Sequence, residues 1–422
     1  MMGGTTSSYS TMAAVSTLMQ VGLCPFRILY NRRTMPALVS LRKLFCCFVV
    51  ISLLFVIQQQ VTAAPLPHLD TPLSPDVTSF GISPDGRYLV FVQRFPPPAG
   101  RDNSVHHLRL FDLHTLSLRT LATNAAGFNR IAFESADRFA YLSGWEGVIL
   151  MDVSGKELRR FPSGGYHAFC NNTRFLGTVA GVELLTADHR QIKAFSGKGE
   201  FTHAVCSPER LLLIFKQQAS LLDAKSLEPV CTFVAKDGSL TNYQQGALLG
   251  NNRFALLGHW AGVALFDACK QTRKLIPDTM AMAHTDQLLL GHAGVVKAGR
   301  NQGAFSSNVG LLHYTTNGSY LQTTQLPEVV RQMAPMPGRP ELLMVLAQNG
   351  PFRLLNLKTG RQLTLTLQHN SPHWLLADDS GAYRASPGTE RQLYFTDGNR
   401  LLPAGPLPAD SNLYLRFIGA TP

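Results

Sequence analysis

The chain has 422 residues, of which 45% are hydrophobic and 15% are charged, a composition that excludes a disordered protein. The formal net charge is +11, but the basic residues are scattered, so the sequence excludes the basic stripe that typifies nucleic-acid binding.

Residues 1–63 are predicted to be a targeting leader with a signal peptide. Arg42 and Lys43 precede an uncharged apolar run over 44–57, and the small residue Ala63 follows shortly after it. This order of basic, apolar and small residues is what signal peptidase recognises, which places the cleavage after Ala63. Met35 could be the true start, because it would give the signal peptide a short basic beginning of the usual kind.

The leader predicts an exported protein, either periplasmic or extracellular. The alternative is a chain anchored in the membrane by an uncleaved segment over 44–57. That apolar run is shorter than the ~20 residues that span a bilayer, so we expect no stable membrane span once the leader is removed.

Two later stretches are nearly the same sequence. Residues 138–152 match residues 253–267 without a gap, and related units begin at Arg174 and Arg210. Each copy reads as an apolar strand, a turn, a second apolar strand and then an Asp that opens another turn. A period of about 40 residues with about four short strands is typical of a β-propeller. We therefore predict an all-β fold, a single β-propeller domain over 64–422 with seven or eight four-stranded blades.

Closure of a propeller commonly pairs a strand from one end of the chain with a strand from the other. Leu413–Ile418, near the C-terminal end of the sequence, is the predicted closing strand.

Two segments resemble known propellers. Ser83-Pro-Asp-Gly-Arg-Tyr-Leu-Val-Phe91 resembles the WD-repeat-like motif of exported bacterial propellers, the TolB- and lactonase-like group. Asn356-Leu-Lys-Thr-Gly-Arg361 resembles a turn of quinoprotein propellers. The resemblance implies the fold and names no function, since both motifs are generic. The Trp that locks quinoprotein blades is missing from the expected turns, so we expect no quinone and predict no cofactor.

Two His-Ala-x-Cys segments occupy the same register in neighbouring units. They are His167 to Cys170 and His203 to Cys206, and both fall on predicted innermost strands. Imidazole and thiolate are zinc ligands, but positions three apart on a strand point to opposite faces, so no metal site is predicted. A Cys170–Cys206 disulfide suits an exported protein, and simple packing of buried histidines and thiols is the other interpretation.

Candidate binding residues come from the turns and the inner strands. Trp145 and Trp260 occupy the turns of the twin units, where a large ring can line a ligand-binding rim. With His259, His167 and His203 they form the predicted set. The alternative is that each Trp only packs against the next blade, because equivalent positions in a repeat usually serve equivalent packing.

Local catalytic motifs are missing from the sequence. There is no Gly-x-Ser-x-Gly, His-Glu-x-x-His, Cys-x-x-Cys, phosphate-binding or dinucleotide-binding motif. This favours a binding or scaffold module for a protein, peptide or glycan partner, with no nucleic acid bound. The alternative hypothesis is a lactonase-like hydrolase whose site is assembled from several blades at the mouth of the central channel.

Overall fold

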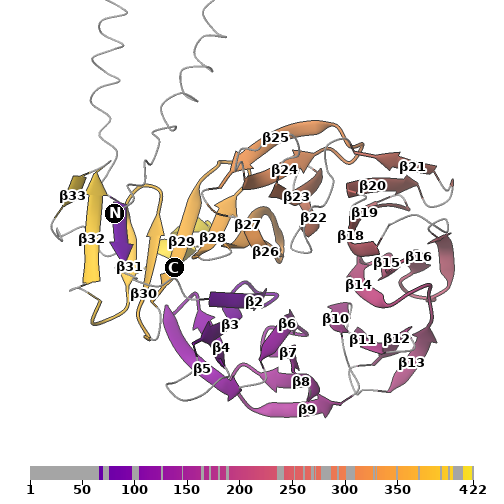
Figure 1. Ribbon diagram of the computed structural model, residues 1–422, viewed down its shortest axis with the longest axis horizontal. Helices are drawn as coiled ribbons and strands as arrows, with labels where there is room; N and C mark the ends of the chain where they lie inside the picture. The colour runs from indigo at the N-terminus through magenta and orange to yellow at the C-terminus, as the bar shows by residue number, and fades with distance from the viewer. Residues whose placement is uncertain are drawn as a thin grey trace, which may run out of the picture. The chain divides into compact units, whose positions relative to one another are not determined.

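A computed structural model describes the chain between residues 66 and 420 (Figure 1). Within that span the undescribed positions are 70–75, 97–103, 125–126, 145, 163–165, 171–172, 179–180, 187–189, 235–241, 251, 260–261, 268–269, 271, 277–286, 292–293, 301–308, 327, 329, 348–349, 369–370, 390–391, 398–399 and 403–411. The predicted leader lies outside the described residues. In the part that is described, no helix has both the length and the apolar character needed to cross a membrane.

The β-propeller is confirmed. Its blades are antiparallel sheets of four strands that are consecutive in the sequence, and their first strands contact one another in turn around the ring. The first three blades contain β2 (Asp76–Ile82), β3 (Tyr88–Phe95), β4 (Val105–Asp112), β5 (Ser117–Asn124), β6 (Phe128–Phe133), β7 (Arg138–Ser143), β8 (Gly147–Asp152), β9 (Glu157–Phe161), β10 (Tyr166–Cys170), β11 (Thr173–Thr178), β12 (Gly181–Leu185) and β13 (Gln191–Phe195). The next three contain β14 (Phe201–Cys206), β15 (Arg210–Phe215), β16 (Gln218–Asp223), β17 (Pro229–Val234), β18 (Asn242–Gly250), β19 (Arg253–His259), β20 (Gly262–Asp267), β21 (Thr272–Leu275), β22 (Gln287–Gly291), β23 (Gly294–Arg300), β24 (Val309–Tyr314) and β25 (Tyr320–Gln325).

The middle strands are apolar on both faces because each blade lies between two others. On β15, Leu211 and Leu213 pack with the third blade, whereas Leu212 and Ile214 pack with the fifth. Each fully buried Leu or Ile contributes about 1.5–3 kcal/mol relative to an exposed one. A strand with this double burial reads as a continuous apolar run, which is why the repeat was visible in the sequence.

The predicted number of blades is wrong, since the structure contains six four-stranded blades rather than seven or eight. The ring is completed by a larger, six-stranded sheet. Its strands are β26 (Val330–Met336), β27 (Arg339–Ala347), β28 (Phe352–Asn356), β29 (Gln362–Leu367), β30 (Trp374–Asp378) and β31 (Tyr383–Ala385). Instead of starting another blade, β30 pairs with β29 because Trp374 and Leu376 are buried in the core shared with Phe352.

A separate three-stranded sheet joins the two ends of the described chain. It contains β1 (Leu66–Leu69), β32 (Leu393–Asp397) and β33 (Arg400–Leu402) in that order. Strand β1 pairs antiparallel with β32, with Leu66 opposite Thr396. The last strands of the chain are therefore divided, with β30 and β31 in the six-stranded sheet and β32 and β33 in this one.

The predicted closing strand is also wrong, because Leu413–Phe417 forms the short helix α3. The neighbouring residues Leu413 and Tyr414 are both buried in one core cluster, whereas successive residues of a strand point to opposite faces. The Tyr414 hydroxyl donates a hydrogen bond to the Gly86 carbonyl at 2.6 Å, which ties the helix to the first blade.

Hydrogen bonds and an ion pair from side chains, rather than a shared strand, join the last sheet of the ring to the first blade. The Gln332 amide on β26 accepts a hydrogen bond from the Phe80 N–H at 2.9 Å and donates one to the Phe80 carbonyl at 2.8 Å. Beside it, Arg331 Nη1 donates to Asp76 Oδ1 at 2.7 Å. These contacts join the six-stranded sheet to the inner strand of the first blade.

Candidate functional site

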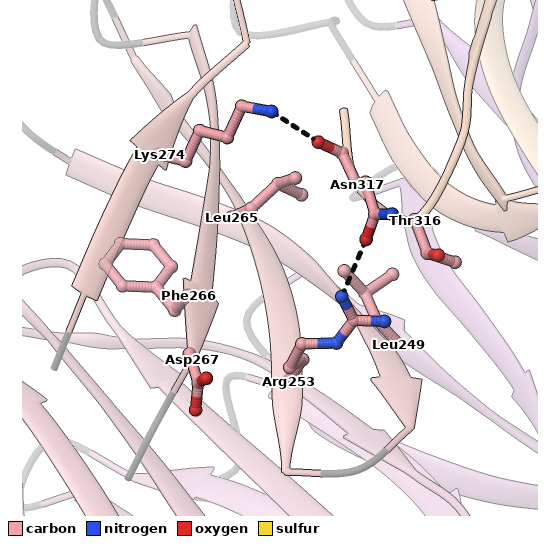
Figure 2. A pocket seen from close by; sticks show the side chains of 8 residues that line it. All are labelled: Leu249, Arg253, Leu265, Phe266, Asp267, Lys274, Thr316 and Asn317. Carbon is pink, nitrogen blue, oxygen red and sulfur yellow. Dashed lines mark hydrogen bonds between the residues drawn. The ribbon is translucent and has the colours of Figure 1, made fainter. Parts of the chain in front are cut away.

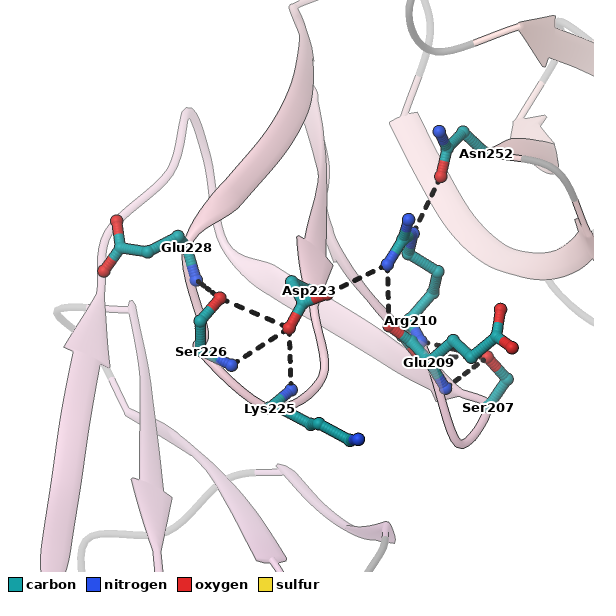
Figure 3. A network of polar contacts seen from close by, with 8 residues as sticks. All are labelled: Ser207, Glu209, Arg210, Asp223, Lys225, Ser226, Glu228 and Asn252. Atoms are coloured by element: carbon teal, nitrogen blue, oxygen red, sulfur yellow. Dashed lines mark hydrogen bonds and ion pairs between the residues drawn. The ribbon is translucent and has the colours of Figure 1, made fainter.

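The repeated Arg and Asp residues form a structural pair at one end of several blades. In the first blade Arg87 Nη2 lies 2.8 Å from Asp112 Oδ2, and in the fourth blade Arg210 Nη1 lies 3.0 Å from Asp223 Oδ2 (Figure 3). The second oxygen of Asp223 accepts hydrogen bonds from the backbone N–H groups of Lys225 and Ser226, each at 3.0 Å. Backbone N–H donors of Ser226 and Lys225, aided by Arg210, lower the pKa of Asp223. The pair therefore fixes the turn that follows the third strand.

The fifth blade departs from this pattern, as do the second, where Arg138 lies 4.0 Å from Asp137, and the third, where Arg174 pairs with Glu134. Arg253 is directly opposite Asp267 in the β19–β20 register, yet its guanidinium does not form an ion pair with that carboxylate in the described structure. Arg253 Nη1 donates instead to Asn317 Oδ1 of the next blade at 2.9 Å. The Lys274 ammonium donates to the backbone carbonyl of the same Asn317 at 2.7 Å (Figure 2).

A pocket of about 360 Å³ lies where these residues meet, between the fifth and sixth blades. Strands β18 to β21 and the turn between β24 and β25 provide its walls. Its lining consists of Leu249, Arg253, Leu265, Phe266, Asp267, Lys274, Thr316 and Asn317 (Figure 2). Arg253 is half-buried and Lys274 is exposed.

The charges of this pocket are unbalanced. Arg253 and Lys274 point at Asn317 and donate only to its neutral oxygens, while Asp267 has an ion pair with Lys270 at 3.6 Å. A carboxylate acceptor would add the attraction between opposite charges to these hydrogen bonds, which the neutral Asn317 does not supply. The pocket can therefore bind a carboxylate or another anion with two charged donors against an apolar wall.

This pocket lies at the opposite end of β19 from the residues predicted to bind. Strand β19 begins at Arg253 and ends at His259, with Trp260 next in the sequence. Trp145 and Trp260 fall outside the described residues, and so do the side chains of His167, His259 and Cys170. The binding roles of these residues stay predictions.

His203 is the described member of the predicted set. It lies on β14, the inner strand of the fourth blade, and is partly exposed there. Burial and then the charge of Arg130 lower its pKa to about 4, so the imidazole is neutral at pH 7. Arg130 lies on β6, the inner strand of the second blade.

Cys206, at the end of β14, is disulfide-bonded. Its pairing with Cys170 stays a prediction. Among the residues the structure describes, no group of three or more His, Cys, Asp or Glu side chains is arranged to hold a metal ion. The lactonase-like alternative stays a hypothesis that these observations do not test.

Sequence reasoning missed the pocket because no local motif encodes it. Arg253 and Asn317 are 64 residues apart and come from different blades. Arg253 was recognised as a marker of the repeat, but which acceptor its guanidinium takes depends on how two blades pack. The repeat could have indicated Arg253 as a residue to inspect, because it marks the equivalent position in each unit. It could not indicate which acceptor the guanidinium has.

Comparison with known proteins assigns no family. No family model matches the chain, and no curated protein matches it. Among solved structures it is similar to the WD40 β-propeller domain of Doa1, with 12% identity, a TM-score of 0.47, and coverage of 69% of this chain and 95% of that one. The β-propeller domain of Cps50 (Swd1) from Myceliophteria thermophila gives 14% identity, a TM-score of 0.45, and coverage of 72% and 100%. U3-55K gives 12% identity, a TM-score of 0.47, and coverage of 67% and 93%. Likenesses at this level do not bear on what the chain binds.

Proposed function

We propose that this protein is a binding module that recognises an acidic segment of a protein or peptide partner. The observation that supports this is the pocket between the fifth and sixth blades, where Arg253 and Lys274 both donate to the neutral residue Asn317. An acidic side chain of a partner would replace or join the Asn317 oxygens as acceptor. A neutral glycan offers no such charge, so a protein or peptide is the favoured partner.

The fifth blade differs from the other blades in the acceptor of its repeated arginine. Where Arg87 and Arg210 are held by an Asp of their own blade, the guanidinium is occupied in stabilising a turn. In the fifth blade Arg253 is directed to the neighbouring blade, at the edge of an open pocket. Arg138 and Arg174 also have partners other than the Asp of their own repeat, but those partners are the acids Asp137 and Glu134, whereas the acceptor of Arg253 is neutral.

The expected affinity contribution follows from burial. Arg253 is half-buried, so a charge-assisted hydrogen bond to a partner carboxylate contributes about 1.5–3 kcal/mol. Lys274 is exposed, so its ion pair contributes about 0.2–1 kcal/mol. Because the Lys274 pair is exposed, the binding should also weaken as the salt concentration rises.

Fluorescence anisotropy with a labelled hexaglutamate peptide tests the proposal, with hexalysine as the control peptide. We expect the purified protein to bind hexaglutamate, the Arg253→Gln variant to bind about 10-fold to 100-fold more weakly, and Lys225→Gln to bind like the original. Lys225 is the matched control because it is an exposed lysine on the equivalent end of the fourth blade. Equal affinity for hexaglutamate and hexalysine would contradict the proposal.

Asn317→Asp gives a sharper test in the same assay. The substitution changes almost no volume and places a carboxylate between the two cations, where the partner's acid is proposed to bind. We expect this variant to keep its fold and lose affinity for hexaglutamate as Arg253→Gln does. Unchanged binding would show that the probe binds elsewhere.

We also propose that the protein is exported after removal of residues 1–63. Cleavage after Ala63 would leave the first described strand, β1, intact to pair with β32. Mass spectrometry of the protein recovered from the medium or periplasm should find an N-terminus at Ala64. Recovery of a chain that retains residues 44–57 in the membrane fraction would favour the anchored alternative.

A further inference from the structure

Arg109 is a buried arginine with no carboxylate partner among the described residues. It lies on β4 of the first blade with 6% of its surface exposed. Its Nη1 donates to Gln93 Oε1 at 2.7 Å and to the Ser371 carbonyl at 3.3 Å, both of which are neutral. Burial lowers the pKa of Arg109 to about 10, so the guanidinium still carries its charge at pH 7.

Two other arginines among the described residues, the buried Arg174 and the half-buried Arg353, are each paired with an acid. Arg174, which is 1% exposed, lies 2.6 Å from Glu134, and Arg353 donates to both carboxylate oxygens of Glu328 at 2.6 and 3.1 Å. A buried charge without an opposite charge is costly, which is why such groups are nearly always paired. Arg109 departs from that rule within the same fold.

Two further buried donors lie in the same cluster without an acceptor. These are the Nε atom of Arg109 and the Nε2 atom of Gln93, a residue with no exposed surface. Gln93 is opposite His107 in the β3–β4 register, and both Arg109 and burial keep the pKa of His107 low. The cluster therefore presents a guanidinium and an amide N–H that both need an acceptor, and its described residues include no anion.

We propose that Arg109 and Gln93 form a binding site for a small inorganic anion, with chloride as its ligand, between the first blade and the turn that precedes β30. Arg109 supplies the charge and the Nε donor, and Gln93 supplies the amide donor. The turn contributes through Ser371, whose carbonyl already accepts from Arg109. Because Gln93 is fully buried and Arg109 nearly so, we expect the site to select a small anion over a larger oxyanion or an organic acid.

The site goes beyond the proposed partner binding and is independent of it, since Arg109 is not part of the pocket at Arg253. Its expected effect is on closure of the ring. Arg109 links the first blade to the six-stranded sheet, so an anion that neutralises it would stabilise the junction closed by Gln332 and Phe80. Loss of the anion would leave the fold intact and less stable.

Thermal unfolding in sodium chloride against sodium gluconate of equal ionic strength tests the proposal. Gluconate is too large to enter, and the ionic strength is the same, so screening cancels. We expect the midpoint of the purified protein to be about 2–4 °C higher in chloride, with a saturable dependence on its concentration. Identical midpoints in the two salts would overturn the proposal.

Two variants distinguish the loss of the anion site from a general loss of stability. Arg109→Met should abolish the difference between chloride and gluconate, and in gluconate it should be at least as stable as the original because an unpaired buried charge is removed. Arg353→Met, which breaks the pair with Glu328, should be destabilised in both salts and keep the chloride effect. A chloride effect that persists in Arg109→Met would contradict the assignment.

Crystals soaked in bromide provide a test that does not depend on the variants folding. The proposal predicts an anomalous peak at hydrogen-bond distance from Arg109 Nε and Gln93 Nε2. A map with no bromide at that position, from crystals soaked at a concentration that saturates the thermal effect, would refute the site.

Discussion

Gln332 is the residue whose replacement tests the closure of the ring most sharply. Its amide pairs with both backbone groups of Phe80, a residue that is 1% exposed and lies on the inner strand of the first blade. Gln332→Met keeps the length of the side chain and removes both hydrogen bonds. Each backbone group left without a partner costs about 1–3 kcal/mol, so the loss should be about 2–6 kcal/mol.

Urea unfolding followed by tryptophan fluorescence measures this loss. The matched control is Gln325→Met on β25, because Gln325 is exposed and substitutions at such surface positions are usually within about 0.5 kcal/mol of neutral. Gln332→Glu keeps an acceptor for the Phe80 N–H and removes the donor to its carbonyl, so it should be destabilised as well. If Gln332→Met unfolds at the same urea concentration as Gln325→Met, the reasoning on ring closure is wrong.

Three other predictions concern named side chains. The pKa of His203 is about 4 in the folded state against an ordinary value of 6.5, so the unfolded chain binds the proton more readily. The free energy of unfolding should therefore be constant above pH 6.5 and fall by up to about 3 kcal/mol between pH 6.5 and 4. His203→Gln should remove this fall from a profile of stability against pH. Arg174→Met, which leaves Glu134 without its buried partner, should cost about 3–5 kcal/mol in urea unfolding, and a double-mutant cycle with Glu134→Gln should show coupling between the two. Thiol titration of the denatured, unreduced protein should find fewer than four reactive groups among Cys170, Cys206, Cys231 and Cys269, and four would show that the disulfide prediction is wrong.

The repeat predicted the strands well because each middle strand is apolar on both faces. The twin stretches are β7 with β8 and β19 with β20, and their Arg and Asp residues are opposite each other in both sheets. The Asn356 turn also forms as expected, with Asn356 accepting from the N–H groups of Lys358 and Thr359. Local patterns therefore determined the strands and turns.

Closure of the ring and the pocket at Arg253 depend on contacts between distant residues, which no local sequence pattern predicts. Leu413–Phe417 is a short apolar segment that could be a strand or a helix, and burial of Leu413 and Tyr414 in one cluster favours a helix. The blade count was too high because β30 adds to an existing sheet, and only the packing of Trp374 decides that. For the same reason, the partner of Arg253 could not be read from its own blade.

The central claim is that the pocket between the fifth and sixth blades binds an acidic group. A crystal structure of the protein with the hexaglutamate peptide tests it most directly. We expect a carboxylate of the peptide about 2.7–2.9 Å from the Arg253 guanidinium and from the Lys274 ammonium. A peptide bound at another face of the propeller, with Arg253 and Lys274 still donating only to Asn317, would contradict it.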